Sequence, residues 1–178
     1  MRATLKFLGV LFIAFLVMMA FRALVFTICT IDGDGLAPRF KAGDRVIVNR
    51  WSYGLRTGER GGLFDYGRLC RQEIKRGDII AFDDEKGNIY LCRCAAVPGD
   101  TILTKGQTLC VVPGLINCAD RDYYWVEAIG RNNPLSSEQL GFVYEEQIIG
   151  RACLVLYSHD PSAPFWNGYR SDRLLLPQ

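Results

Sequence analysis

Few side chains in this sequence are placed to do chemistry. His159 is the only histidine among the 178 residues, so we expect neither a histidine-based metal site nor a Ser-His-Asp triad. Asp32 and Asp34 lie close together in "IDGDGLAP" and form a candidate acid pair, but neighbouring loop carboxylates are ordinarily solvated turn residues. Thr30 offers a hydroxyl with no base near it in the sequence.

The seven cysteines offer two further kinds of chemistry. Cys92 and Cys94 are two apart on an expected strand, so they share a face and cannot easily bond to each other. A Cys92 thiolate would need a cationic partner, but Arg93 points to the other face of the strand. Cys110 and Cys118 flank a Pro-Gly turn and form a candidate disulfide. No CxxC pair is present, so we expect no zinc site, and no cofactor is indicated.

An apolar run near the N-terminus predicts a membrane anchor. It begins after Arg2 and Lys6 and continues past Arg22, and neither candidate cleavage site has small residues at both −3 and −1. The alternatives are a buried soluble helix and a cleaved signal peptide. The positive-inside rule then predicts a cytoplasmic segment 1–6, a transmembrane helix 7–30 and an extracytoplasmic, periplasmic domain 31–178. The expected location is the cytoplasmic (inner) membrane, with the lipid bilayer as a partner.

The remaining sequence is typical of a β domain. Short runs rich in Val, Ile and Tyr alternate with Gly-Asp turns, and no long helical periodicity interrupts them. The runs are "RVIVN", "DIIAF", "IYLCRCAAV", "TIL", "YYWVEAI" and "ACLVLY". This pattern predicts a mainly β, antiparallel sheet or barrel-like domain, with a long irregular loop in the glycine-rich stretch after Trp51. The net charge of +2 without a basic stripe excludes nucleic acid as an expected partner.

Three segments together resemble one family. "LAPRFKAGDRVIVNRWSYG", "KRGDIIAFDDEKGNIYLCRCAAVPGD" and "GFVYEEQIIGRACLVLYS" are similar, in order and spacing, to the conserved segments of type I signal peptidases. The resemblance covers nearly the whole chain after the expected anchor. It implies a signal-peptidase-type β domain that recognises exported pre-proteins through small side chains at −1 and −3.

The resemblance also locates the family's catalytic pair. In that family a Ser nucleophile lies three residues before a Pro, and a Lys acts as its general base. The corresponding positions here are Gly35, three residues before Pro38, and Cys92. Glycine has no side chain with which to attack, and burial raises a thiol pKa, so Cys92 is a poor substitute for a neutral amine. The catalytic pair is therefore expected to be lost.

Three functions remain open at this point. The first is a catalytically inactive signal-peptidase-like protein that binds exported substrates or serves as an accessory subunit of an active paralogue or an assembly line. The second is an active signal peptidase with non-standard catalytic residues, and the third is a structural module whose groove is closed. For the first function, the candidate substrate-groove residues are Gly33, Leu36, Pro38, Tyr90 and Cys94.

Overall fold

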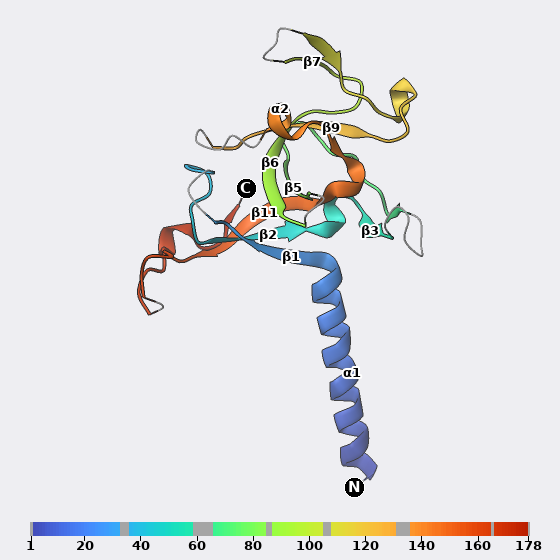
Figure 1. The fold of residues 1–178 in the computed structure, drawn as a ribbon. Helices are drawn as coiled ribbons and strands as arrows, with labels where there is room; N and C mark the ends of the chain where they lie inside the picture. Colours follow the sequence, from blue (N-terminus) through green and yellow to red (C-terminus); the bar gives the residue numbers. More distant parts are fainter. Residues whose placement is uncertain are drawn as a thin grey trace.

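A long helix and a β domain make up the chain. The computed structural model describes residues 2–32, 36–58, 66–84, 87–104, 108–130, 136–164 and 166–177. Helix α1 (Arg2–Val25) projects away from the β domain, as Figure 1 shows. The predicted mainly β class is confirmed for the rest of the described chain.

The β domain is built on one curled sheet of eight strands. Every pairing in it is antiparallel, in the order β1-β2-β11-β5-β6-β9-β10, with β12 beside β11. The strands are β1 (Phe26–Thr30), β2 (Asp44–Asn49), β5 (Ile79–Asp83), β6 (Ile89–Ala96), β9 (Tyr123–Glu127), β10 (Val143–Tyr144), β11 (Ile148–Ser158) and β12 (Leu176–Pro177). The register shifts where β11 meets β2 and β5, and where β6 meets β9. Such irregularities bend strands and increase their twist, which allows a sheet to curl.

Two ribbons and several short helical turns complete the domain. The ribbons each contain two antiparallel strands, and the β7–β8 ribbon lies at the end of the domain opposite α1 (Figure 1). These elements are η1 (Arg50–Tyr53), β3 (Leu55–Thr57), β4 (Gly67–Leu69), β7 (Thr101–Leu103), β8 (Leu109–Val111), η2 (Leu115–Asn117), α2 (Ser137–Leu140), η3 (Glu145–Gln147) and η4 (Ser171–Arg173).

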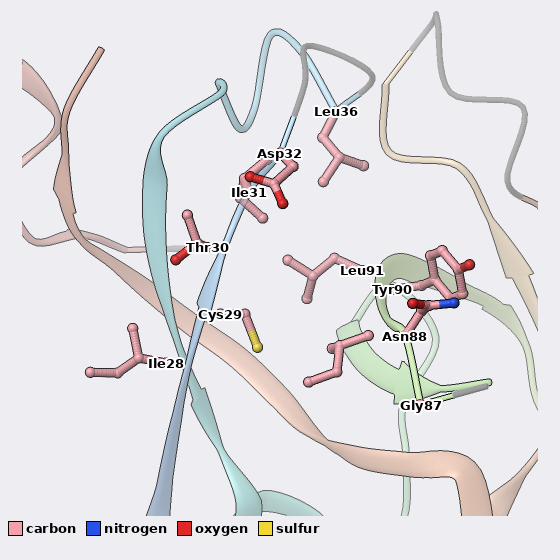
Figure 2. Close-up of a pocket in the computed structure, with 11 residues that line it drawn as sticks. Ile28, Cys29, Thr30, Ile31, Asp32, Leu36, Gly87, Asn88, Tyr90 and Leu91 are labelled. Carbon is pink, nitrogen blue, oxygen red and sulfur yellow. The ribbon is translucent and has the colours of Figure 1, made fainter. Parts of the chain in front are cut away.

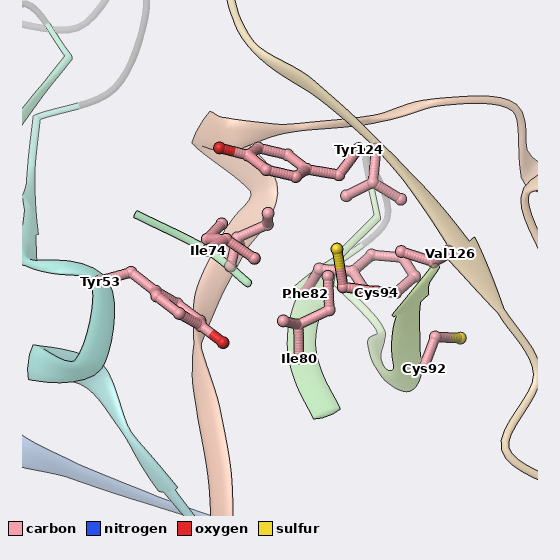
Figure 3. Close-up of a cluster of buried hydrophobic side chains, with 10 residues drawn as sticks. Tyr53, Ile74, Ile80, Phe82, Cys92, Cys94, Tyr124 and Val126 are labelled. Atoms are coloured by element: carbon pink, nitrogen blue, oxygen red, sulfur yellow. The ribbon is translucent and has the colours of Figure 1, made fainter. Parts of the chain in front are cut away.

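Alternating side chains of the sheet fill two separate hydrophobic clusters. Because successive residues of a strand point to opposite faces, Ile79 and Ala81 enter one cluster while Ile80 and Phe82 enter the other. The first cluster also contains Phe40 and residues of β1, β2 and β11. The second is drawn in Figure 3, where residues of β5, β6 and β9 meet Tyr53 and Ile74.

The predicted transmembrane helix over 7–30 is wrong. Within the described chain, no helix is both long and apolar enough to cross a membrane. The last part of the predicted span is not helical at all, because residues 26–30 form β1 and pair with β2. Three of those five residues, Thr27, Ile28 and Thr30, are β-branched, which favours an extended conformation.

Two local predictions also need correction. Cys110 and Cys118 are both free thiols rather than a disulfide. The Pro-Gly turn between them does not close a hairpin: β8 pairs with β7, and the residues after the turn form η2. The glycine-rich stretch after Trp51 is not wholly irregular, because it contains η1 and the β3–β4 ribbon.

Candidate functional site

A groove lies between β1 and the beginning of β6. It has a volume of about 740 Å³. One wall is formed by residues 28–32 and Leu36, and the other by residues 87–91, as Figure 2 shows. The two walls come from segments about sixty residues apart in the sequence, and the curl of the sheet brings them together.

Both walls present strand edges that no described strand covers. Strand β1 is at the end of the sheet and pairs only with β2. Strand β6 pairs with β5 along residues 89–93, but β9 joins its other edge only from Arg93 onward. The edge of residues 89–92 beside the groove is therefore open among the described strands.

The two open edges belong to strands that are four pairings apart in the sheet. Four successive antiparallel pairings lead from β1 through β2, β11 and β5 to β6, and the curl of the sheet leaves β1 and β6 running in different directions, as Figure 1 shows. Unpaired strand edges carry rows of N–H and C=O groups that template the addition of another strand. An extended chain in the groove can therefore pair with one of these open edges.

Apolar side chains meet on the floor of the groove. Figure 2 shows Cys29, Ile31 and Leu91 pointing toward the space between the two walls. Ile31 and Leu91 are buried, and Cys29 is half-buried, which raises the pKa of its thiol. An apolar floor with open backbone edges suits an extended peptide better than a charged small molecule.

The loop at one end of the groove is fixed by residues far away in the sequence. Ile31 donates its N–H to the Asp44 carbonyl at 2.9 Å, and Gly43 donates its N–H to the Ile31 carbonyl at 2.9 Å. Arg173 binds the Asp44 carboxylate, with a shortest contact of 2.7 Å, and donates to the Arg39 carbonyl at 2.7 Å. The C-terminal segment thus holds the turn that follows the β1 wall.

Cys92 and Cys94 lie in the protein core. Because Leu91 faces the groove, Cys92 points to the opposite face of β6, and both cysteines belong to the cluster of Figure 3 with no exposed surface. Burial raises the pKa of each thiol to about 12. Neither thiol is ionised at neutral pH, so neither is an activated nucleophile.

The structure separates the residues that the sequence singled out. Leu36 and Tyr90 line the groove, whereas Pro38 is exposed and is not among the lining residues. The Tyr90 hydroxyl donates to the Asp84 carboxylate at 3.3 Å. Gly33, Asp34 and Gly35 lie outside the described residues. Among the residues that are described, no three metal-binding side chains gather into a cluster.

Sequence reasoning missed several groove residues. Thr30 and Asp32 were considered only as catalytic candidates, and Cys29 lies within the predicted transmembrane range 7–30. All three line the groove, together with Ile28, Ile31, Asn88, Ile89 and Leu91. The signal that marks the β1 wall is the run from Thr27 to Ile31, in which four of the five residues are β-branched and favour an extended strand.

The sequence of this chain matches that of a peptidase family. Residues 4–117 match the sequence model of the family described as "Signal peptidase, peptidase S26". The match covers well over half of the chain, so the chain belongs to this family. The resemblance found in the sequence is thus confirmed at the level of the family. The loss of the catalytic pair stays a prediction.

Curated relatives carry the same family name. The chain is 30% identical over 99 residues to signal peptidase IB of Staphylococcus aureus, which covers 56% of this chain and 44% of that protein. It is 32% identical over 100 residues to signal peptidase I of Bacillus caldolyticus, covering 56% of this chain and 46% of the relative. The chain therefore spans less than half the length of these relatives.

Proposed function

We propose that the groove binds an extended segment of an exported protein without cleaving it, at an extracytoplasmic site. The observation that carries this proposal is the pair of open strand edges on either side of a floor of apolar side chains. Binding by strand addition draws its affinity from backbone hydrogen bonds and its specificity from pockets for alternate side chains. Neither requires a nucleophile.

The expected absence of cleavage rests on the two family positions. Gly35 has no side chain, and Cys92 is fully buried with its thiol pKa raised to about 12 by that burial. In a catalytic pair, loss of one member already removes most of the rate. Binding and cleavage are therefore expected to be uncoupled in this chain.

A peptide-binding assay tests this function directly. We expect the purified full chain to bind a fluorescent extended peptide containing Ala-x-Ala in fluorescence polarisation, while mass spectrometry detects no shortened product. A matched peptide with alternate backbone amides methylated should not bind, because it lacks the donors that strand addition uses. Cleavage of the unmodified peptide would support an active signal peptidase instead. Survival of that cleavage in Cys92→Ala would exclude a cysteine mechanism.

One backbone donor on the β1 wall is well placed for a second test. Successive residues of a strand direct their N–H groups to opposite edges, and the Ile31 N–H points to Asp44 on the β2 side. The Thr30 N–H therefore points toward the open edge. We expect Thr30→Pro to weaken peptide binding about tenfold or more, since it removes one hydrogen bond of about 1 kcal/mol and places a ring against the incoming backbone.

The matched control keeps the backbone donor. Thr30→Val retains the N–H and the β-branched shape and loses only the hydroxyl, so it should bind peptide as the wild type does. Proline is tolerated on an edge strand, and the melting temperature of Thr30→Pro should stay close to that of the wild type. Equal peptide affinity of Thr30→Pro and wild type would contradict pairing along the β1 edge.

A further inference from the structure

Asp32 places a carboxylate at one end of the groove. Its side chain is exposed and lies beside Leu36, at the end away from Gly87, as Figure 2 shows. Among the described residues that line the groove, Asp32 is the only charged one. Within the described chain, the structure gives its carboxylate neither an ion pair nor a hydrogen bond.

The other end of the groove differs in its chemistry. There the Asp84 carboxylate accepts hydrogen bonds from the Asn88 backbone at 2.9 Å, the Asn88 amide at 3.1 Å and the Tyr90 hydroxyl. Asp84 thus shapes the β6 wall, and its acceptor capacity is used within the protein. Among the described residues, the groove therefore carries one solvent-facing negative charge, and it lies at the Asp32 end.

We infer that Asp32 selects peptides that carry a lysine or arginine directly beside the segment held by strand addition. This inference rests on the proposed function, and it names the class of peptide: an extended chain with small residues in the groove and a cation at one flank. An ammonium or guanidinium placed there gains a charge-assisted interaction that a neutral side chain lacks. A glutamate at the same place meets like charge.

The test compares peptides that differ only in the flanking residue. Lys, Gln or Glu is placed before or after the same Ala-x-Ala core, and affinities for the full chain are measured by fluorescence polarisation at low and high salt. At one of the two flanks, we expect the peptide with Lys to bind about threefold tighter than the peptide with Gln at the same position, as for a solvent-exposed ion pair. High salt should abolish that difference. The flank that responds also gives the direction of the bound peptide.

Three variants separate the carboxylate from a general charge effect. Asp32→Asn should bind the Lys and Gln peptides equally, and Asp32→Lys should prefer the Glu peptide. Asp172→Asn removes another exposed carboxylate, which does not line the groove, so it should keep the wild-type preference.

The outcomes distinguish this inference from the function on which it rests. Equal binding of the Lys and Gln peptides by the wild type, or a preference that survives in Asp32→Asn, overturns the role of Asp32 while peptide binding stands. If no peptide of the set binds to the wild type, both the groove function and the role of Asp32 are overturned.

Discussion

Replacing Cys92 with lysine is expected to leave the protein about 4 kcal/mol less stable at pH 7 than the Cys92→Met variant, because burial disfavours the charged amine by several pKa units. Cys92 is fully buried, and it pairs across the sheet with Ile80, another side chain without exposed surface. Methionine is a suitable reference because it is also long and unbranched but carries no charge. The difference between the two variants therefore isolates the cost of burying the amine.

The pH dependence of that difference has a definite sign. Burial lowers the pKa of the lysine in the folded state below its unfolded value of about 10.4. Between these two pKa values the unfolded state binds more protons, so the stability of Cys92→Lys rises with pH. Urea unfolding of both variants from pH 7 to 10 should show that the difference in their free energies of unfolding decreases. A stability difference between the two variants that is small at pH 7, or independent of pH, would mean that the amine reaches water.

The same cost of burial bears on the predicted loss of the catalytic pair. The resemblance places the family's general base at Cys92, but in this chain that position lies among the apolar side chains of Figure 3. A lysine introduced there must first overcome the cost of burial. We therefore expect the double variant Gly35→Ser, Cys92→Lys to be unstable near neutral pH rather than to become a peptidase.

The central strands of the fold are predictable from local sequence. Runs such as "DIIAF" and "ACLVLY" combine β-branched residues with flanking turns, and both lie in strands of the sheet. Strand β1 was missed because its residues continue an apolar run, and only its pairing with β2 distinguishes it from the helix. The β3–β4 ribbon was missed because its support is non-local: Arg68 of β4 donates to the carbonyls of Glu145 and Ile148.

The candidate site was only partly predictable. Alternation correctly places Cys92 and Cys94 on one face of β6, but the sequence does not say which face meets the groove. That choice depends on the curl of the sheet, which turns Leu91 toward β1. Asp32 was set aside as a solvated turn residue because its position beside an open strand edge is a property of the tertiary structure.

A second large loss of stability is expected from a substitution where the C-terminal segment contacts the loop at one end of the groove. Asp44 has no exposed surface, and the Arg173 side chain is 9% exposed. The Arg173 guanidinium binds both carboxylate oxygens, at 3.2 and 2.7 Å, and the Lys41 N–H donates to the same carboxylate at 2.9 Å. Burial by itself would raise the pKa of Asp44, but these bonds and the positive charge outweigh it and lower the pKa.

Removing the arginine should therefore be costly. We expect Arg173→Met to lower the free energy of unfolding by about 3–5 kcal/mol, because it leaves the Asp44 carboxylate buried without its counter-ion. The matched control is Arg76→Met, which breaks the ion pair of Arg76 with Asp100. The Arg76 side chain is 64% exposed, so that variant should lose less than about 1 kcal/mol.

Lowering the pH should reduce the difference in the free energy of unfolding between wild type and Arg173→Met. In the wild type the lowered pKa of Asp44 contributes stability above the unfolded value of about 3.9, and this contribution is lost as the pH falls through the folded pKa. In Arg173→Met, burial without the guanidinium raises that pKa above the unfolded value, so protonation relieves the buried charge as the pH falls. Unfolding free energies measured at pH 7 and pH 4 should therefore differ less between the two proteins at pH 4. A gap of constant size would show that Arg173 stabilises the loop through its bond to the Arg39 carbonyl and its packing, and not through the charge of Asp44.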